Sequence, residues 1–405
     1  MNSPELHSSD AHRYFSTYIL HEQTAARVVD GVALAYEHRS PAGVFALISP
    51  WNMPLYLLTW KIAPCIAFGC TAVAKPSEMT SISAYRMFSH QAYSHKLTVN
   101  GNKLTVAVLG VLLQKAELPP GVVNIVLGDG PTTGAALVAS PLIDGVSFTG
   151  GTPTGIAIRR ATAHQIRKHL SLELGGKNPN LVFADSMAPA TRERTIRIAA
   201  SAAFENQGEI CLCGSRVYVE RSAYEEFVRE FTDYVAKKYM LRKTVGAVAS
   251  RQHYDKIRGY LKLAEDEKAT FRLGSVPPPL DESDNQGYWI APTILTDVAP
   301  ESLLQKDEIF GPVVTISPFE DEDEAVRLAN DSEYGLAAVV LTNDGARMRR
   351  VGEQIEAGLV WVNCWLVREL GTPFGGMKNS GTGREGGEYS RDVFTVVRTL
   401  HLPAY

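Results

Sequence analysis

The chain has 405 residues, of which 45% are hydrophobic and 21% charged, and its formal net charge is −4. A chain of this size can bury a large apolar core, and we expect it to form more than one lobe. The 40 basic and 44 acidic residues are mixed along the sequence without a long basic run. This pattern argues against binding of nucleic acid.

Membrane insertion, secretion and metal binding are also not expected. The most apolar stretch, Leu55–Phe68, is interrupted by Lys61 and Pro64 and is shorter than the roughly 20 residues of a membrane helix. Residues 1–18 are polar, unlike a signal peptide, so we expect a cytoplasmic protein. The odd number of cysteines and the lack of repeated CxxC or of HExxH favour neither disulfides nor a metal site. The five cysteines are Cys65, Cys70, Cys211, Cys213 and Cys364.

Strand and helix patterns alternate along most of the chain. Residues 26–41 resemble a hairpin, and short β-branched runs follow at 43–49, 71–75, 122–128 and 145–150, separated by helical stretches such as 55–68. A second series has strand patterns at 180–184, 215–219, 293–298, 312–319, 337–342 and 359–363, with helices at 224–238, 322–330 and 346–355. Such alternation predicts an α/β protein with parallel sheets, whose strands end in polar or glycine-rich turns where ligands bind.

The predicted lobes meet at residues 174–177, where Gly175 and Gly176 allow a sharp change of direction. We divide the chain into residues 1–25, a hairpin at 26–41, a first lobe at 42–174, a second lobe at 175–389 and a terminal strand at 390–405. The terminal run 394–402 has no strand partner nearby in sequence. Together with the hairpin it suggests strand pairing between subunits of a homodimer or homotetramer.

A polar, glycine-containing turn at 204–216 holds Cys211 and Cys213 between a helix and a strand. An exposed thiol there could act as a nucleophile. The alternative is that both cysteines pack in the core, because free cysteine is usually buried. Glu173, 38 residues before Cys211, lies at the lobe junction between apolar neighbours. A carboxylate in a closed cleft can accept a proton from water, whereas a surface glutamate would have no such role.

Seven motifs in this order resemble the aldehyde dehydrogenase superfamily. They are Pro50–Pro54, Lys75–Glu78, Phe148–Gly151, Glu173–Lys177, Asn206–Cys211, Glu308–Pro312, and Pro373–Gly376 with Ser380–Glu385. The resemblance implies a Rossmann-like NAD-binding lobe at 42–174, preceded by a remnant of that lobe at 1–25, and an α/β catalytic lobe at 175–389. It also implies that the hairpin and the terminal strand form an oligomerisation element.

The resemblance assigns the catalytic roles. Cys211 matches the nucleophile, and Cys213 is expected to be supporting structure. The side-chain amide of Asn52 and the backbone N–H of Cys211 would stabilise the oxyanion of the thiohemiacetal. After hydride transfer, Glu173 would activate the water that hydrolyses the thioester. Relatives that transfer the acyl group to coenzyme A typically lack this glutamate, so a free acid is the expected product.

The resemblance also places the cofactor. Lys75 and Glu78 resemble the pair that holds the adenosine ribose, and a carboxylate there repels a 2′-phosphate, which favours NAD over NADP. The remaining cofactor residues are Trp51, Gly128, Thr149 and Gly150 for the pyrophosphate side and Glu308 and Phe310 for the nicotinamide side. Gly151 stands where the family commonly has serine. The GxGxxG pattern at 381–386 follows a loop, and we do not interpret it as a dinucleotide motif.

Within the superfamily the sequence is most similar to family 8, which acts on 2-aminomuconic semialdehyde in tryptophan catabolism. The phrases LSLELGGKNP, NQGEICLC and VNCWLVREL carry this similarity. Arg368 in the last phrase could bind a substrate carboxylate with two hydrogen bonds. The alternative is a surface salt bridge to Glu369 or Glu385.

Three departures from the family motivate a second hypothesis. The family's first segment is absent, residues 89–105 look like an insertion, and the chain is shorter around 237–245. Loss of core from the cofactor lobe would leave sheet edges and apolar surface exposed. The alternative function is therefore a catalytically impaired form of the same scaffold that binds NAD or modulates oligomers.

Overall fold

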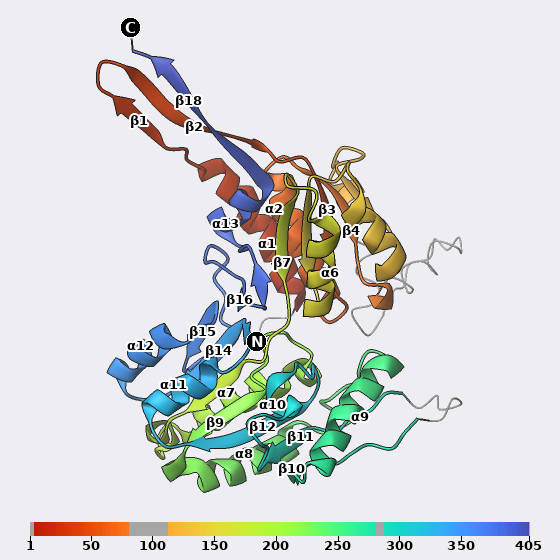
Figure 1. The fold of residues 1–405 in the computed structure, drawn as a ribbon, viewed down its shortest axis with the longest axis vertical. Coiled ribbons are helices and arrows are strands. Elements are labelled where there is room, and N and C mark those ends of the chain that lie inside the picture. The colour runs from red at the N-terminus through yellow and green to blue at the C-terminus, as the bar shows by residue number, and fades with distance from the viewer. Residues whose placement is uncertain (1–3, 81–111, 281–286, 405) are drawn as a thin grey trace. The chain divides into compact units, whose positions relative to one another are not determined.

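The computed structural model describes residues 4–80, 112–280 and 287–404 (Figure 1). The predicted insertion at 89–105 lies outside the described residues. The chain forms two compact units. Unit 1 contains Met1–Glu173, Glu369–Phe374 and Thr382–Tyr405, and unit 2 contains Leu174–Arg368 and Gly375–Gly381.

A six-stranded sheet forms the centre of unit 1, in the order β17-β7-β6-β3-β4-β5. From β7 to β5, each neighbouring pair of strands is parallel. The β-branched and apolar runs at 44–48 and 145–149 become its most buried strands, as expected for a parallel sheet covered on both faces. The strands are β3 (Val44–Ile48), β4 (Thr71–Lys75), β5 (Val123–Ile125), β6 (Gly145–Thr149), β7 (His169–Glu173) and β17 (Gly381–Thr382).

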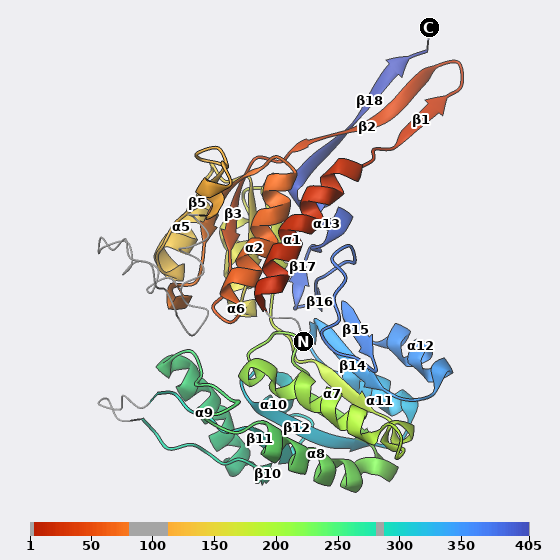
Figure 2. The same ribbon diagram turned by 180° about the vertical axis from the view of Figure 1, so that it is seen from behind.

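Helices cover both faces of this sheet. α1 (Pro4–Tyr18) and α2 (Pro54–Ala67) lie on one face, in front in Figure 2, and α6 (Thr152–Thr162) lies on the other. Phe15 of α1 and Trp60 of α2 pack with Phe45 of β3 in one apolar core. The other helical segments of unit 1 are η1 (Ile19–His21), η2 (Gly130–Gly134), α5 (Ala135–Ala139) and α13 (Gly387–Phe394). Among the helices of the described chain, none has the length and hydropathy needed to cross a membrane.

A separate three-stranded sheet extends from unit 1 (Figure 1). It consists of the hairpin β1 (Ala26–Val29) and β2 (Ala33–Pro41) with the terminal strand β18 (Thr395–Pro403). The terminal strand β18 pairs with β2 of the same chain, and strand pairing between subunits stays a prediction. β18 runs antiparallel along the whole of β2, from the pair Thr395–Pro41 to the pair Pro403–Ala33. This partner lies more than 350 residues away in sequence, where local patterns give no signal.

Unit 2 is built on a seven-stranded sheet in the order β10-β11-β12-β9-β8-β14-β15. Every neighbouring pair is parallel except β10–β11 at the edge. The strands are β8 (Pro179–Val182), β9 (Arg216–Glu220), β10 (Thr270–Leu273), β11 (Thr293–Thr296), β12 (Val313–Phe319), β14 (Ala337–Leu341) and β15 (Leu359–Val362). A small antiparallel pair is formed by β13 (Tyr334–Gly335) and β16 (Met377–Lys378).

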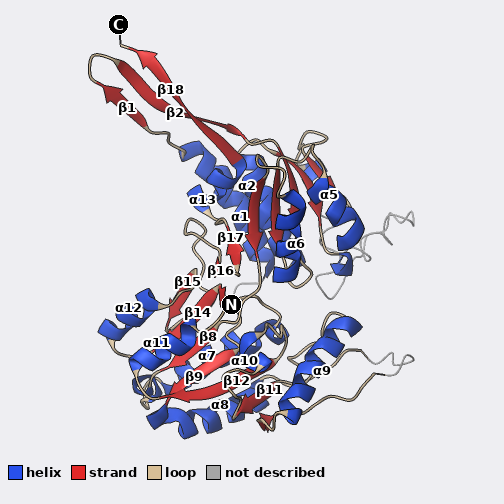
Figure 3. Ribbon diagram, viewed as in Figure 1, coloured by secondary structure: helices blue, strands red, loops and turns tan. Residues whose placement is uncertain are grey.

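The helices of unit 2 also lie on both faces of its sheet (Figure 3). α7 (Arg192–Phe204) and α8 (Tyr224–Lys238) pack on one face, and α11 (Glu322–Asn330) and α12 (Gly345–Gln354) on the other. α9 (Arg251–Asp266) lies beside α10 (Leu303–Lys306) and contributes Tyr254, Ile257 and Leu261 to a second core cluster. Their spacing of three and four residues gives α9 one apolar face. Short 3₁₀ segments are η3 (Ala184–Met187), η4 (Glu205–Gly208) and η5 (Arg221–Ala223).

The boundary between the units differs from the sequence-based division after residue 368. Residues 369–374 and 382–389 belong to unit 1 rather than to the second lobe. The segment β17 joins the unit 1 sheet next to β7, and Phe374 and Glu385 exchange two backbone hydrogen bonds of 2.8 and 2.7 Å. The chain therefore returns to its first unit before the terminal strand, which no periodicity in this loop-rich stretch indicates.

Candidate active site

The catalytic and cofactor-binding residues predicted in unit 1 lie at or just after the carboxyl ends of its parallel strands. Asn52 follows β3, Lys75 ends β4, Gly128 follows β5, and Thr149 ends β6. Glu173 ends β7 directly beside Thr149. Because parallel strands end at the same edge of a sheet, one edge collects these residues, and open α/β sheets bind their ligands at this edge.

Lys75 and Glu78 form an ion pair at the end of β4, with Nζ and Oε2 3.6 Å apart. The Lys75 side chain is only 2% exposed and its amine also donates to the Pro76 carbonyl at 3.1 Å, whereas Glu78 is half exposed. The lysine is thus fixed by its surroundings, and the glutamate carboxylate remains accessible to a ligand.

Two glycines at this edge leave no room for a side chain. Gly128 has a φ of +149°, and a Cβ there would collide with the side chain of Thr133. A Cβ at Gly150 would collide with the ring of Phe148. Gly150 and Gly151 lead into α6, an eleven-residue helix whose first turn closes on the carbonyl of Gly151, which accepts the N–H groups of Thr154 at 3.0 Å and Gly155 at 3.2 Å. The backbone here can approach an anionic group closely.

Glu173 is 3% exposed, and its backbone carbonyl accepts a hydrogen bond from Gly150 at 3.0 Å. It is therefore not the solvated surface glutamate that the sequence left open. Asn52 and Trp51 lie partly exposed just before α2, in the turn after β3. The start of α2 is fixed by Pro54 in its first turn, a position that suits proline.

Unit 1 also contains a buried ion pair that the sequence analysis did not single out. Lys61 Nζ lies 2.8 Å from Glu385 Oε1 and donates to Ser147 Oγ at 3.0 Å. Both ionic side chains are at most 9% exposed. Glu385 is thus a buried side chain, and the carboxylate of Glu369 accepts the N–H of Gly371 at 2.8 Å. The alternative salt bridge of Arg368 stays a prediction. In the sequence, the only local sign of this ion pair is the cationic Lys61 in the middle of the mostly apolar α2.

In unit 2, Cys211 follows a loop with an unusual backbone. Asn206, Gln207 and Gly208 all have left-handed φ values of 49°, 57° and 70°. A Cβ at Gly208 would collide with the carbonyl of Gly311, so this loop lies directly against residues 308–312. The structure thus brings together Cys211 and the predicted nicotinamide residues Glu308 and Phe310 within unit 2.

The segment Gly175–Asn178 connects these two loops. Gly176 N–H donates to Glu308 Oε1 at 2.9 Å, and a Cβ at Gly175 would collide with Glu308 Oε2. On its other side, the Asn178 amide donates to the carbonyl of Cys211 at 2.7 Å and to that of Cys213 at 2.9 Å. Gly175 is therefore needed for the close approach of the Glu308 carboxylate, whose burial raises its pKa, and Gly176 for the close approach of Asn178 and the Cys211 carbonyl.

The two neighbouring cysteines have different environments. Cys211 is partly accessible, whereas Cys213 is 6% exposed and its burial raises the pKa of its thiol to about 12. Since the thiolate is the nucleophile, Cys213 is unreactive at neutral pH. Burial likewise raises the pKa of Cys364.

Arg368 belongs to a loop that touches the nucleophile turn. The indole N–H of Trp365 donates to the carbonyl of Leu212, the residue after Cys211, at 3.2 Å. Trp361 holds the end of the same loop by donating to the carbonyl of Val367 at 2.9 Å. Arg368 is partly buried at the end of this loop.

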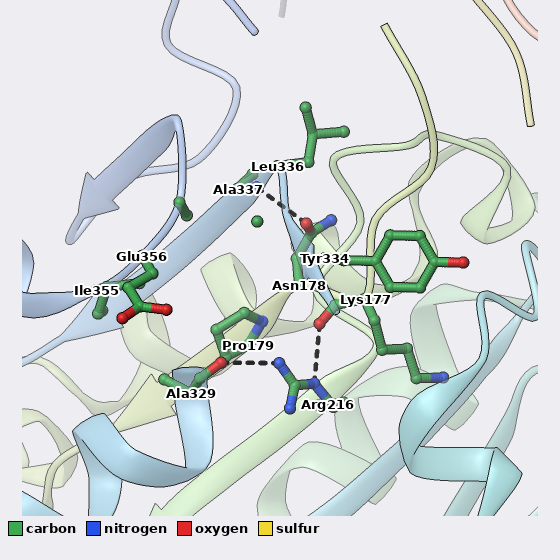
Figure 4. A pocket seen from close by; sticks show the side chains of 12 residues that line it. Lys177, Asn178, Pro179, Arg216, Ala329, Tyr334, Leu336, Ala337, Ile355 and Glu356 are labelled. Atoms are coloured by element: carbon green, nitrogen blue, oxygen red, sulfur yellow. Dashed lines mark hydrogen bonds between the residues drawn. The ribbon is translucent and has the colours of Figure 1, made fainter. Parts of the chain in front are cut away.

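A small cavity near Lys177 is structural rather than a ligand site (Figure 4). The guanidinium of Arg216, 2% exposed, donates to the carbonyls of Lys177 at 2.8 Å and Ala329 at 2.9 Å, so its donors serve the backbone. The amine of Lys177 points away from Arg216, and burial, together with the charge of Arg216, lowers its pKa to about 7.

Comparison with known proteins is consistent with this geometry. The profile of the aldehyde dehydrogenase family matches residues 5–92 and 100–400. The 2-aminomuconic semialdehyde dehydrogenase of Bos taurus is 44% identical over 401 residues, which cover 96% of this chain and 76% of that protein. The chain belongs to the aldehyde dehydrogenase family. It is an oxidoreductase that acts on aldehydes, and the predicted fold is confirmed.

Other members of the aldehyde dehydrogenase family show the same likeness. The 2-hydroxymuconic semialdehyde dehydrogenase of Pseudomonas sp. (strain CF600) is 41% identical over 375 residues, covering 91% of this chain and 71% of that protein. The NAD+ complex of the aldehyde dehydrogenase from Bacillus cereus has a TM-score of 0.86 at 34% identity, covering 98% of this chain and 76% of that one. The comparisons give no support to the catalytically impaired alternative.

The sequence analysis of this aldehyde dehydrogenase missed the role of α9, which contacts the loop at 307–311. The signal that could have found the helix is local. Ser250 is an N-cap whose side chain accepts the N–H of His253 at 3.1 Å, and apolar residues follow at helical spacing.

Proposed function

We propose that this chain oxidises a carboxylated semialdehyde to the carboxylic acid with NAD, using Cys211 as nucleophile. The observation that carries the proposal is the arrangement in unit 2, where the partly accessible Cys211 follows a loop whose Gly208 lies against Gly311, next to Phe310. The similarity to dehydrogenases of two muconic semialdehydes supports the substrate class.

The first step forms a bond between the Cys211 sulfur and the aldehyde carbon, and the carbonyl oxygen becomes an oxyanion. Fixed N–H donors stabilise such charge most strongly where water is excluded. The Cys211 backbone N–H and the Asn52 amide are the donors in this proposal. The backbone on the other side of Cys211 is held by Asn178, whose amide donates to the Cys211 carbonyl at 2.7 Å.

The residues of unit 1 fit a dinucleotide. An accessible carboxylate beside a buried lysine suits two ribose hydroxyls, and the side-chain-free backbone at Gly128 and Gly150 suits a pyrophosphate. Trp51 and Thr149 belong to the same edge of the sheet. Glu308 and Phe310 would hold the nicotinamide end. When bound, NAD accepts the hydride that leaves the thiohemiacetal carbon, which leaves a thioester on Cys211.

Glu173 then activates water for hydrolysis of the thioester. Its carboxylate is buried at the end of β7, where it serves as the general base in this proposal. Water attacks the acyl carbon, its proton goes to Glu173, and the Cys211 thiolate leaves. The product is the free acid.

Arg368 is the proposed specificity residue for the substrate carboxylate. Its loop is attached to the nucleophile turn through the Trp365–Leu212 hydrogen bond. A guanidinium can bind a carboxylate with two parallel hydrogen bonds, which a neutral aldehyde cannot form. Both named semialdehyde relatives act on molecules that bear a carboxylate, which is consistent with this role.

The decisive test compares two neighbouring thiols. We expect Cys211→Ala to abolish NADH formation with an aldehyde, and the matched control Cys213→Ala to retain most of it. Alkylation by iodoacetamide followed by peptide mapping should label Cys211 first, since Cys213 is buried with a raised pKa. Loss of activity with preferential labelling of Cys213 would contradict the assignment.

We also propose a cytoplasmic homo-oligomer that pairs through the three-stranded sheet. Val28, Val396 and Val397 in this sheet are 73%, 46% and 50% exposed, and β1 and β18 are its edges. Such edges and apolar side chains favour pairing with another copy. Light scattering should report a dimer or larger, and charged residues at the three valines should yield monomers.

A further inference from the structure

Cys211 is one of the two central residues of a tight turn at 210–213. The N–H of Cys213 donates to the carbonyl of Ile210 at 2.9 Å and closes this turn. A trans peptide is planar, so its carbonyl and its N–H point in opposite directions. Because the Ile210 carbonyl points into the turn, the N–H of Cys211 in the same peptide points out of it. The turn therefore sets the direction of the N–H that is proposed to bind the oxyanion.

Side chains from outside the turn bind its next three carbonyls. The Asn178 amide donates to the carbonyl of Cys211 at 2.7 Å and to that of Cys213 at 2.9 Å. The indole of Trp365 donates to the carbonyl of Leu212, which lies between them in sequence, at 3.2 Å. One amide therefore ties the nucleophile to the last residue of the turn, and a second donor holds the residue in between.

The Asn178 side chain is itself held firmly. It is 2% exposed, and its Oδ1 atom accepts the N–H of Ala337, at the start of β14, at 3.0 Å (Figure 4). A Cβ at Gly176 would lie 2.7 Å from this oxygen and 2.9 Å from the Cys211 carbonyl, so backbone packs closely against both. The turn is thus attached through Asn178 to a buried strand of the unit 2 sheet.

The chemistry of the side chain suits this task. The Asn178 amide uses two N–H donors and one acceptor on a single planar group. Among the side chains, only asparagine and glutamine offer this combination. An aliphatic side chain of the same size would fill the space but would leave two carbonyls of the turn without this donor.

We propose that Asn178 is a positioning residue that holds the turn 210–213 in the conformation in which the Cys211 N–H faces the developing oxyanion. This inference rests on the proposed function, because it takes Cys211 as the nucleophile. Asn178 acts through the backbone and does not touch the reacting atoms. Its loss should therefore slow the formation of the thioester and leave the binding of cofactor and aldehyde intact.

The test follows NADH formation in a single turnover, which reports thioester formation whatever step limits kcat. Asn178→Leu keeps the size of the side chain and removes both donors. We expect it to slow NADH formation about 10- to 100-fold, because a displaced oxyanion donor loses much of its effect. The Kd for NAD and the aldehyde concentration at half-maximal rate should stay within about twofold of wild type.

The matched control is Asn180→Leu. Asn180 lies two residues further along, on β8, and is fully buried, and its amide donates instead to the carbonyl of Ala199 in α7 at 3.4 Å. Both variants remove a buried amide, so the thermal midpoint should fall in both. Only Asn178→Leu should slow NADH formation, and equal slowing in the two variants would overturn the proposal.

Alkylation of Cys211 gives a second readout, because attack of the thiolate on iodoacetamide creates no oxyanion. The rate of alkylation and its pH profile in Asn178→Leu should match wild type, and a parallel loss of alkylation would overturn the proposal. If this variant fails to fold, Asn178→Ser replaces it. Its hydroxyl supplies one donor at most, so NADH formation should slow about 3- to 10-fold, the usual effect of one lost hydrogen bond.

Failure of the proposed function would look different. If Cys211→Ala still forms NADH, the assignment of the nucleophile is wrong. If Cys211→Ala is inactive while a folded Asn178→Leu or Asn178→Ser forms NADH at the wild-type rate, only the positioning role of Asn178 is rejected.

Discussion

Glu209, two residues before the nucleophile, should make the stability of the protein fall as the pH rises. Its side chain is 4% exposed and lies near Gln207 and His253, at 3.3 and 3.5 Å. Burial raises the pKa of Glu209 from 4.5 to about 8. The folded protein therefore keeps a proton on this carboxyl group over a pH range in which the unfolded chain has lost it.

The sign follows from proton linkage. Between pH 4.5 and about 8 the folded state binds more protons than the unfolded state, so the free energy of unfolding decreases with rising pH. Below and above that range the contribution is constant. One pKa unit corresponds to about 1.4 kcal/mol, which gives an upper bound of about 5 kcal/mol over the whole range. Glu209→Gln removes this term because the amide does not titrate.

Other groups nearby titrate as well, and the assay must separate them. The lowered pKa of His253, about 4 instead of 6.5, contributes a stability that increases with pH below 6.5. The lowered pKa of Lys177, about 7 instead of 10.5, contributes an increase above 7. The contribution of Lys177 is the same in wild type and variant, so it cancels in the difference between the two. His253 lies 3.5 Å from Glu209, so its titration is coupled to the substitution and must be avoided by the choice of pH. The window from pH 7 to 8 lies above most of the titration of His253.

The measurement is the difference in thermal midpoint between Glu209→Gln and wild type across that window. We expect the variant to gain stability relative to wild type as the pH rises. The control Glu193→Gln, at an exposed position of α7, should show a constant difference. A flat profile for Glu209→Gln would mean that the carboxyl group is ionised in the folded protein and that the reasoning from burial is wrong.

Three further substitutions test the site. Arg368→Ala should lose about 1.5–3 kcal/mol in kcat/KM for a carboxylated aldehyde and little for an uncarboxylated one, and equal losses would reject its role in specificity. Glu78→Gln should narrow the preference for NAD over NADP, measured as the ratio of kcat/KM values, and wild type that uses both equally would refute the role of Glu78. Gly175→Ala should raise the Kd for NAD and cost about 1–3 kcal/mol of stability, because its Cβ would displace the Glu308 carboxylate.

Motifs and periodicity predicted most of the strands, because buried parallel strands are short, continuous apolar runs. The runs at 71–75 and 145–149 became β4 and β6. The same reasoning could not find the partner of β18 or the return of residues 382–405 to unit 1, because both depend on pairing between segments distant in sequence. Long-range pairing has no local periodic signal.

The candidate residues could be named from the sequence, but their environments could not. Nothing local distinguishes Cys211 from Cys213 in exposure, since the two thiols are separated by one residue on the same turn. The structure separates them through burial, which raises the pKa of Cys213 to about 12. The contacts of His253 were likewise hidden, because its partner is a backbone carbonyl, which every residue type provides.

The contact between Gly208 and Gly311 has a mechanical consequence. Each residue is a glycine at the contact, so backbone meets backbone with no side chain that could change rotamer and absorb a displacement. Packed protein interiors are nearly incompressible. A shift of the loop that carries Phe310 must therefore displace the loop that carries Cys211. We expect the alkylation rate of the Cys211 thiol to report such a shift.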